Sequence, residues 1–192
     1  MPRRKEFDQN KVLDKAIELF WRPGYHATSI QHLVAHLGIS RSSLYDTFGD
    51  KRSLFLSALA RYAQQQSEQI KQAFGSKLGR EAIELLFEGF VEQAMSDSLC
   101  RGCFMVNATT ELAANDDEVA DKACNNRRDY EALFYKLLVS AQANGDVSAK
   151  HDPRALARFL FSAMQGLQVI AKTRPERQVL DDIVKVTLSV LR

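Results

Sequence analysis

The 192-residue sequence has few residues that interrupt helices: four prolines and nine glycines, nearly all between periodic apolar runs. Its three cysteines, an odd number, do not make a disulfide framework and fit a reducing compartment. No stretch approaches the roughly 18 uninterrupted apolar residues of a membrane span. The N-terminal "MPRRKEF" lacks the apolar core of a signal peptide. We therefore expect a cytoplasmic globular protein that does not contact a membrane.

The net charge of +2 is distributed unevenly along the chain. Residues 1–62 hold ten Lys and Arg against six Asp and Glu, whereas the remainder holds sixteen against eighteen. Three of the four histidines, His26, His32 and His36, also lie in the first part. The N-terminal third is therefore the part that we expect to face an anionic partner.

Apolar residues recur at helical spacing along the whole chain, and no segment is convincing as a strand. N-caps are available at Thr28 or Ser29, at Ser40 and at Asp50, and Gly38 is a stop signal. The pattern predicts an all-α fold of about nine helices. They run approximately over residues 12–20, 30–37, 40–48, 50–74, 83–91, 103–114, 117–144, 153–170 and 179–191.

The stretch "GISRSSLYDTFGDKRSLF", residues 38–55, is too polar for a buried helix. About three residues around Gly38 and Ile39 join two short helices, which is the length of a helix-turn-helix corner. With Leu44 and Phe48 turned inward, the outward side carries Ser42, Ser43, Tyr45 and Asp46, flanked by Arg41. Such side chains suit phosphates and base edges in a major groove. A solvated polar helix is the alternative interpretation.

Residues 8–55 resemble the DNA-binding domain of the TetR family of bacterial transcriptional regulators. The matching elements are Gly24-Tyr25, Thr28-Ser29-Ile30, Gly38-Ile39-Ser40, Leu44-Tyr45, Phe48, and Lys51 with Leu54. The rest resembles the family's helical regulatory domain through "RGCFMVNATTELA" and "MQGLQVIAKTRP". The resemblance implies a helix-turn-helix domain over residues 1–50, a long linking helix over 51–74, and a ligand-binding and dimerisation domain over 51–192.

The same resemblance implies which residues contact DNA. Tyr45 and Lys51 resemble phosphate-contacting residues, and Thr28 lies at a helix N-terminus, where a phosphate is favoured. Arg41, Ser42 and Ser43 occupy positions that touch base edges. The expected DNA-binding residues are Thr28, Ser29, Ser40, Arg41, Ser42, Ser43, Tyr45, Thr47 and Lys51.

Two positions depart from the family pattern, and the tail is open to two interpretations. Position 42 is often glycine in the family, and position 47 is often His or Tyr, whereas this chain has Ser42 and the shorter Thr47. The tail residues Arg3, Arg4 and Lys5 are either a minor-groove arm or a solvated tail.

The C-terminal part has more aromatic and sulfur side chains than a small core requires, with isolated polar groups among them. Apolar walls with a few convergent polar groups are typical of a ligand pocket, and the resemblance implies an effector pocket in this region. We expect a small apolar or aromatic effector. The expected lining residues are Phe87, Phe90, Met95, Phe104, Asn107, Phe134, Phe161, Met164 and Gln165. Plain core packing is the alternative for each of them.

The last two helices have broad apolar faces with few charges between them. The resemblance implies that they pair with a second copy into a four-helix interface. A homodimer also fits a palindromic operator, which needs two recognition helices roughly 34–36 Å apart. Burial of both faces inside one monomer is the alternative.

Cys100-Arg101-Gly102-Cys103, together with Cys124, allows several interpretations. A zinc site lacks a good ligand set, so we expect no metal and no cofactor. A helical Cys-x-x-Cys redox enzyme, resembling alkylhydroperoxidases, needs a nearby histidine, and none follows until His151. Arg101 and a helix start at Gly102-Cys103 favour a redox-active or electrophile-sensing thiolate. The alternative is a structural role, in which Cys103 packs as a small buried hydrophobe.

The sequence therefore predicts a ligand-responsive DNA-binding transcriptional regulator, with repression favoured over activation, and no enzymatic activity. It would bind double-stranded DNA at a palindromic operator as a homodimer and be released by a small-molecule effector. The alternatives are a helical redox enzyme, a repressor that senses redox state or electrophiles through its thiols, and a dimeric adaptor that binds no DNA.

Overall fold

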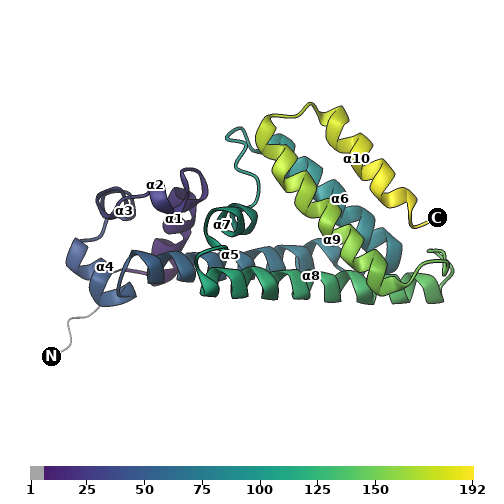
Figure 1. Ribbon diagram of the computed structural model, residues 1–192, viewed down its shortest axis with the longest axis horizontal. Helices are drawn as coiled ribbons and strands as arrows, with labels where there is room; N and C mark the ends of the chain where they lie inside the picture. Colours follow the sequence, from purple (N-terminus) through teal and green to yellow (C-terminus); the bar gives the residue numbers. More distant parts are fainter. Residues whose placement is uncertain (1–6) are drawn as a thin grey trace.

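The computed structural model describes residues 7–192, which are mostly helical (Figure 1). Within these residues there are ten α-helices, one 3-10 turn and no β-strand, so the predicted all-α fold is confirmed. The helices are α1 (Gln9–Trp21), α2 (Gly24–Ala27), α3 (Ile30–Leu37), α4 (Arg41–Phe48), α5 (Lys51–Phe74), α6 (Gly79–Ser96), α7 (Phe104–Leu112), α8 (Asp117–Ala143), α9 (Pro153–Ile170) and α10 (Arg177–Ser189). The 3-10 turn spans Ala171–Thr173. Arg3, Arg4 and Lys5 lie outside the described residues.

Short-range signals fix most helix boundaries. Ser29, Ser40 and Asp50 each accept a hydrogen bond from the backbone N–H three residues later, as N-cap residues do. Gly38 ends α3 in the left-handed conformation, with φ of 69°, which a residue with a Cβ adopts only at a cost. Pro153 occupies the first turn of α9, where its missing N–H is harmless.

Helix α2 is the one element that the sequence pattern did not predict. It has four residues, which is too short to be stable by itself. Its N-cap residue, Pro23, makes no side-chain capping bond. What holds its first turn is a carboxylate from α7, described below.

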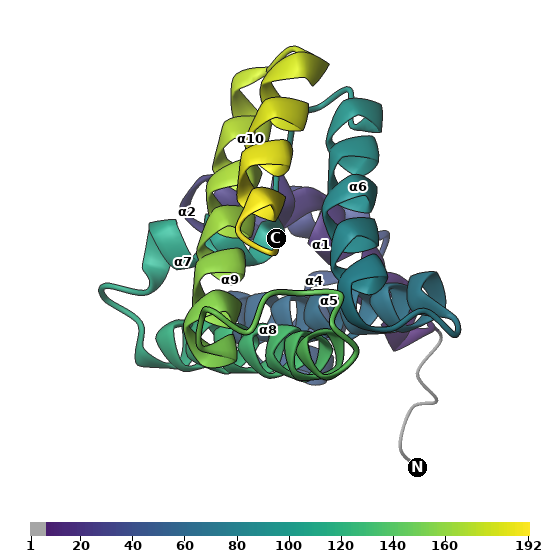
Figure 2. The same cartoon turned by 90° about the vertical axis from the view of Figure 1, so that its right-hand side faces the viewer.

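The helices are arranged in two groups joined by α5 (Figure 1). Helices α1 to α4 form one end of the molecule, and α6, α9 and α10 stand together at the other. Helices α5 and α8 run along one side, and α8 packs against both α6 and α9 (Figure 2). Helix α7 lies between the two groups and packs against α2, α5 and α8.

Two hydrophobic cores stabilise this arrangement. The first buries residues of α1, α3, α4 and the first half of α5, together with Phe104, Met105, Ala108 and Leu112 of α7. The second joins α6, α8, α9 and α10 around Phe87 and Phe134, whose ring centroids are 6.2 Å apart. Helix α7 therefore shares its core with the N-terminal helices, although it comes after α6 in the chain. The domain boundary near residue 50 stays a prediction.

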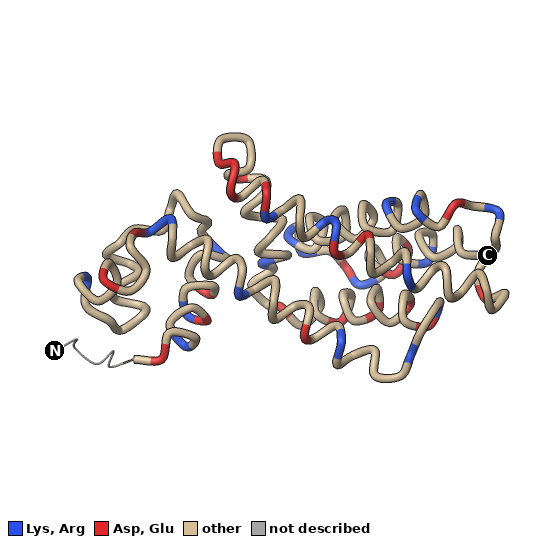
Figure 3. Tube along the Cα trace, turned by 90° about the horizontal axis from the view of Figure 1, so that it is seen from below, with Lys and Arg blue, Asp and Glu red and all other residues tan. Residues whose placement is uncertain are grey.

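Charged residues of both signs are interspersed along the chain (Figure 3). One ion pair ties α1 to α5: the guanidinium of Arg61 donates to both carboxylate oxygens of Asp14, at 2.6 and 2.7 Å. No helix in the described part of the chain is long and apolar enough to cross a membrane.

Candidate functional site

Helix α4 is amphipathic in the way that the sequence predicts. Leu44 is fully buried in the N-terminal core, and Phe48 packs against it. The opposite side is exposed, including Ser42 and 37% of Tyr45. The guanidinium of Arg41 lies 5.7 Å from the Tyr45 ring centroid. The exposed face of α4 therefore combines a cation, hydroxyl groups and one aromatic ring.

Three serine hydroxyls are linked at the start of α4. The Oγ of Ser40 accepts the backbone N–H of Ser43 at 3.0 Å and lies 2.9 Å from the Oγ of Ser42 and 2.8 Å from that of Ser43. This cluster sits at the positive end of the helix dipole, where unpaired N–H groups favour anions. The predicted residues Ser40, Ser42 and Ser43 are thus brought together at one place.

Thr28 and Ser29 have different environments, although they are neighbours in the sequence. Thr28 is 1% exposed, and its hydroxyl donates to the carbonyl of Gly24 at 2.6 Å, closing the short α2. Ser29 is exposed and caps α3 through the backbone N–H of His32. Of the two N-cap candidates for α3, Ser29 is therefore the one that caps the helix. The Thr28 side chain is buried inside the fold and is not presented at the surface.

Lys51, at the start of α5, lies close to α2. Its ammonium is 4.2 Å from the ring centroid of Tyr25, a cation–π contact that holds the side chain in place. Burial lowers the pKa of Lys51, and the nearby carboxylate of Glu111 partly opposes that change. Thr47, by contrast, is partly buried on α4. A positioned ammonium next to α4 suits a phosphate contact better than the shorter Thr47 does.

Two carboxylates, those of Glu111 and Asp116, connect α7 and the start of α8 to these N-terminal helices. The carboxylate of Glu111 accepts the backbone N–H groups of Tyr25 and His26, at 2.9 and 2.8 Å, and so caps α2. Arg52 donates to both oxygens of Asp116, each at 2.8 Å. These bonds lower the pKa of Asp116 to about 2. The exposed end of the molecule is therefore attached to α7 and to the start of α8.

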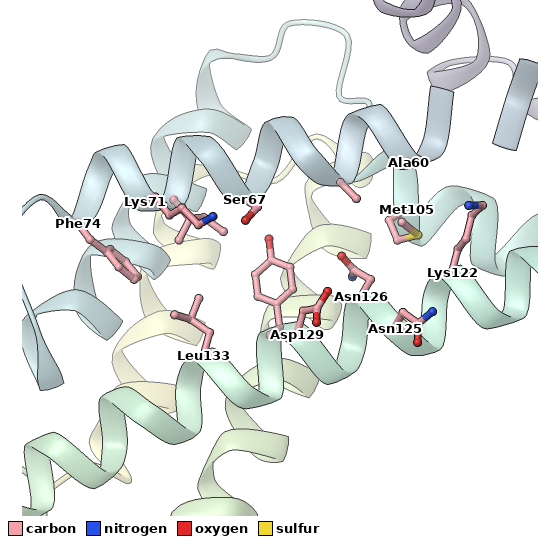
Figure 4. A pocket seen from close by; sticks show the side chains of 13 residues that line it. Ala60, Ser67, Lys71, Phe74, Met105, Lys122, Asn125, Asn126, Asp129 and Leu133 are labelled. Carbon is pink, nitrogen blue, oxygen red and sulfur yellow. The ribbon is translucent and has the colours of Figure 1, made fainter. Parts of the chain in front are cut away.

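A cavity with a volume of about 450 Å³ lies between α5 and α8 (Figure 4). Met105 of α7 closes one end of it, and Phe74 and Leu133 lie at the other. Helix α5 lines this cavity in part with small side chains, those of Ala60, Ala63 and Ser67, which follow one another on one side of the helix. The cavity is large enough for a small organic ligand.

Polar groups are distributed along this mostly apolar cavity. Ser67 of α5 and Asn126 of α8 extend into it from facing helices (Figure 4), and Tyr130 of α8 also lines it. Burial raises the pKa of Tyr130, so its hydroxyl keeps its proton and can donate a hydrogen bond. Lys71 and Lys122 lie near opposite ends. An amphipathic ligand would find both an apolar wall and hydrogen-bonding partners here.

None of the nine residues expected from the sequence lines this cavity. Phe87, Phe134, Phe90 and Met164 are buried in the second core, and Phe104 is buried in the first. The remaining four are Met95, which is exposed, Phe161, which packs near Tyr130, Asn107, and the partly buried Gln165. The physical reason is that large aromatic side chains fill cores, whereas a cavity forms where side chains are small. The row of Ala60, Ala63 and Ser67 at helical spacing was the available signal.

Asn107 has a structural position at the joint between the two groups of helices. Its side-chain N–H donates to the carbonyls of Trp21 and Arg101, at 3.2 and 3.0 Å, and its oxygen accepts from Lys172 at 2.8 Å. Arg101 in turn lies 4.5 Å from the Trp21 ring centroid. Asn107 therefore ties the end of α1 to the loop before α7.

The three cysteines are all free thiols in separate environments. Cys103 packs against the first core, where its sulfur accepts the hydroxyl of Tyr62 at 3.6 Å, and burial raises the pKa of its thiol. Cys100 has a positive φ of 49° and lines a second cavity of about 310 Å³, which Phe90 also lines. Cys124 lies on α8 beside Arg127. The environment of Cys103 favours packing over sensing.

Thiol labelling of the native protein separates these interpretations. Because a thiol with a raised pKa is mostly protonated, we expect Cys103 to resist iodoacetamide near neutral pH until denaturant is added. Cys103→Ser should lower the free energy of unfolding by about 1–3 kcal/mol, since it buries a hydroxyl. Rates per residue come from mass spectrometry. Rapid native labelling of Cys103, with loss of DNA binding that Cys103→Ser prevents, would instead establish sensing.

Comparison with known proteins assigns the two halves of the chain to related families. Residues 12–58 match the family described as bacterial regulatory proteins, tetR family, and residues 79–186 match the tetracyclin repressor-like C-terminal domain. The uncharacterized HTH-type transcriptional regulator YezE of Bacillus subtilis is 38% identical, with both chains covered completely. The HTH-type transcriptional repressor ComR of Escherichia coli is 31% identical, over 97% of this chain and 90% of its own.

A similar solved structure contains DNA. It is a cysteine mutant of the TetR family transcriptional regulator CifR, complexed with 26-bp double-strand operator DNA. It is 32% identical to this chain, covers both chains completely and superposes with a TM-score of 0.83.

Proposed function

The chain belongs to the tetR family of bacterial regulatory proteins, and from this membership we propose that it represses transcription by binding a palindromic operator. The observation that carries the proposal is α4: a helix with a buried Leu44, a hydroxyl cluster at its N-terminus and Arg41 and Tyr45 on its exposed side. The alternative of a redox enzyme is set aside because this family consists of regulators. Because a DNA-binding regulator acts where the chromosome is, we also propose that the protein is cytoplasmic.

Eight of the nine predicted DNA-binding residues take a defined part in this proposal, and Thr47 takes none. Tyr45 and Lys51 contact phosphates, as does the N-terminus of α3 at Ser29. Arg41 and Ser42 reach base edges from the start of α4, where a recognition helix makes its base contacts. Ser40 and Ser43 hold the hydroxyl cluster in place. Thr28 supports the fold beneath them.

Substitutions at Lys51 and Arg41 test these roles. Lys51→Ala should weaken binding to all DNA sequences alike and lower the salt slope by about one unit, because one phosphate contact is lost. Tyr45→Phe should also weaken binding uniformly, whereas Arg41→Ala should relax preference at one operator position. Fluorescence anisotropy over a salt series measures the affinity for each DNA sequence and its salt slope. Lys150→Ala removes an exposed lysine from the other end of the molecule and should change neither; a salt slope unaltered by Lys51→Ala would refute the assignment.

A homodimer follows from the outer faces of α9 and α10. Val179, Ile183, Val186 and Val190 form one stripe along α10, and 68% of Val186 is exposed in the single chain. On α9, Phe159 and Val169 are also exposed. Apolar side chains at helical spacing on the outside of two neighbouring helices are typical of a subunit interface. Pairing through these faces would bring two copies of α4 to a palindrome.

The cavity between α5 and α8 is the proposed effector site. Met105 closes its end, and Glu111 caps α2, and both residues belong to the nine-residue helix α7. An effector that pushes against Met105 would move α7 and with it the cap that holds α2 next to α3. DNA affinity would then fall through a coupling free energy of about 1–3 kcal/mol.

Genomic selection tests the function as a whole. The purified protein is mixed with fragmented genomic DNA, and the bound fragments are sequenced. We expect enrichment of a few sites with a shared palindrome. The genes beside these sites indicate which compounds to test as effectors. A flat response across the genome would contradict a sequence-specific regulator and support the dimeric adaptor that binds no DNA.

A further inference from the structure

A second group of charged residues lies far from α4, in a groove between α8 and α9. The groove has a volume of about 200 Å³. Its charged lining comes from Arg128 and Glu131 of α8 and from Arg154 and Arg158 of α9. Three guanidinium groups thus converge on a space where only one carboxylate is present.

The carboxylate of Glu131 is already shared between two guanidinium groups, those of Arg127 and of Arg158. One oxygen of Glu131 accepts from Arg127 at 2.7 Å, and the other lies 3.8 Å from the Nε of Arg158. Arg128 and Arg154 form no ion pair with any residue in the described part of the chain. Three guanidinium groups against one carboxylate leave an excess of two positive charges in the lining of the groove.

Arg154 is held in position without using its hydrogen-bond donors. Its guanidinium carbon lies 4.7 Å from the ring centroid of Tyr135, a cation–π contact. A guanidinium carries five N–H donors in a rigid fork, which matches a carboxylate or phosphate in two parallel bonds. The stacked Arg154 is therefore prepared to bind an anion.

Arg154 lies in the first turn of the 18-residue α9, whose N-cap residue is Asp152. The carboxylate of Asp152 accepts the backbone N–H of Ala155 at 3.0 Å, so an anion already stands at the positive end of this helix. An anion in the groove would therefore act on the repulsion among the three arginines that line it.

We propose that the α8–α9 groove binds the phosphate group of a small organic molecule. A phosphate monoester carries about −1.5 to −2 charges at neutral pH and three acceptor oxygens, and so balances the excess charge better than one carboxylate. At about 200 Å³, the groove has many times the roughly 10–15 Å³ that one water molecule needs by the same measure. The ring of Tyr135 and the methyl groups of Ala132 and Ala157 give the organic part an apolar wall.

The DNA backbone is a poorer source of this phosphate. Helix α4 stands at one end of the molecule, and the start of α9 lies toward the opposite end (Figure 1). A duplex bound by α4 would therefore lie away from the groove. The proposed ligand is a separate small molecule, and its site is distinct from the cavity between α5 and α8.

Isothermal titration calorimetry with phenyl phosphate tests the proposal on the full-length protein at constant ionic strength. We expect saturable binding at one site per chain, which weakens below about pH 6 as the dianion gains a proton. The double variant Arg128→Gln/Arg154→Gln should weaken it by about tenfold or more, because each charge-assisted hydrogen bond is lost. The control Arg80→Gln/Arg177→Gln removes two arginines elsewhere and should bind as the wild type does. Circular dichroism checks that both variants are folded.

Several outcomes would overturn the proposal. One is the absence of saturable binding to the wild type, and another is an equal loss in the control variant. If the groove variant weakens binding to duplex DNA but not to phenyl phosphate, the groove is a DNA contact. If the variant becomes monomeric with phenyl phosphate binding intact, the arginines serve a partner copy. Inorganic phosphate that binds as tightly as phenyl phosphate would replace the ester by free phosphate.

Discussion

Val186→Glu is expected to leave the chain monomeric and to remove most of its operator affinity. A carboxylate buried in an apolar interface is strongly disfavoured, so the two copies should separate. Specific DNA complexes are roughly 4–10 kcal/mol tighter than non-specific ones. A monomer that reads one half-site would lose about half of that, or roughly 30- to several-thousand-fold in affinity. Light scattering gives the mass, and anisotropy with the selected operator gives the affinity.

Val186 is the right residue for this test because it is mostly exposed in the single chain. The folded monomer therefore tolerates glutamate, whereas Ile183→Glu changes a partly buried residue and would also disturb the core. Lys185→Glu is the matched control, since it places the same side chain one residue away, about 100° around α10 from the apolar stripe. Lys185→Glu should remain a dimer. A dimer in the Val186→Glu variant with intact operator binding would move the interface to another surface.

The helices were predictable because their boundaries depend on neighbouring residues. Ser29, Ser40 and Asp50 bond backbone groups three residues away, and Gly38 needs only its own backbone freedom. The exposed face of α4 was predictable for the same reason, since the buried Leu44 fixes which residues point outward. Sequence periodicity contains this information directly.

Helix α2 and the cavity were not predictable in this way, because both depend on distant parts of the chain. Helix α2 is capped by Glu111, which lies 86 residues after Tyr25. The cavity exists because Ala63 and Ser67 of α5 face Tyr130 of α8, and no local pattern indicates that pairing. Of the aromatic residues expected in an effector pocket, Phe87, Phe90 and Phe134 are buried in the second core and Phe104 in the first, where their large apolar surface stabilises the fold. Their part in an effector pocket stays a prediction.

The position of α7 was not predictable either, because it also depends on distant parts of the chain. Residue 50 separates α4 from α5 in the sequence, and the sequence has no signal that α7 returns to the N-terminal helices. Phe104 packs edge-on against Phe55 and Tyr62, at centroid distances of 5.6 and 5.7 Å, so α7 completes the first core. A helix that is shared in this way can transmit a change in the cavity to the DNA-binding end.

Glu111→Ala tests that transmission at the contact between α7 and α2. The four residues of α2 have no side-chain N-cap of their own, so the variant would leave the N–H groups of Tyr25 and His26 without their partner. A hydrogen bond to a charged group contributes about 1.5–3 kcal/mol, and we expect the free energy of unfolding to fall by about 2–4 kcal/mol. Operator affinity should fall by about tenfold, because α2 leads directly into α3. Denaturant titration and anisotropy measure the two quantities.

The order of the position-111 variants in stability and operator affinity is a sharper test than the loss in Glu111→Ala alone. Glu111→Gln keeps one acceptor oxygen of the two and should lie between the wild type and Glu111→Ala in both stability and operator affinity. Glu88→Ala removes an exposed glutamate from α6 and should match the wild type. Dimerisation should be unchanged in all of them, since α9 and α10 are not involved. If Glu111→Ala bound the operator as tightly as Glu88→Ala does, the cap would not hold α2 and α3 in their DNA-binding arrangement. Release by an effector would then have to travel through the remaining links between the two groups of helices, such as the Arg52–Asp116 pair or the bonds of Asn107.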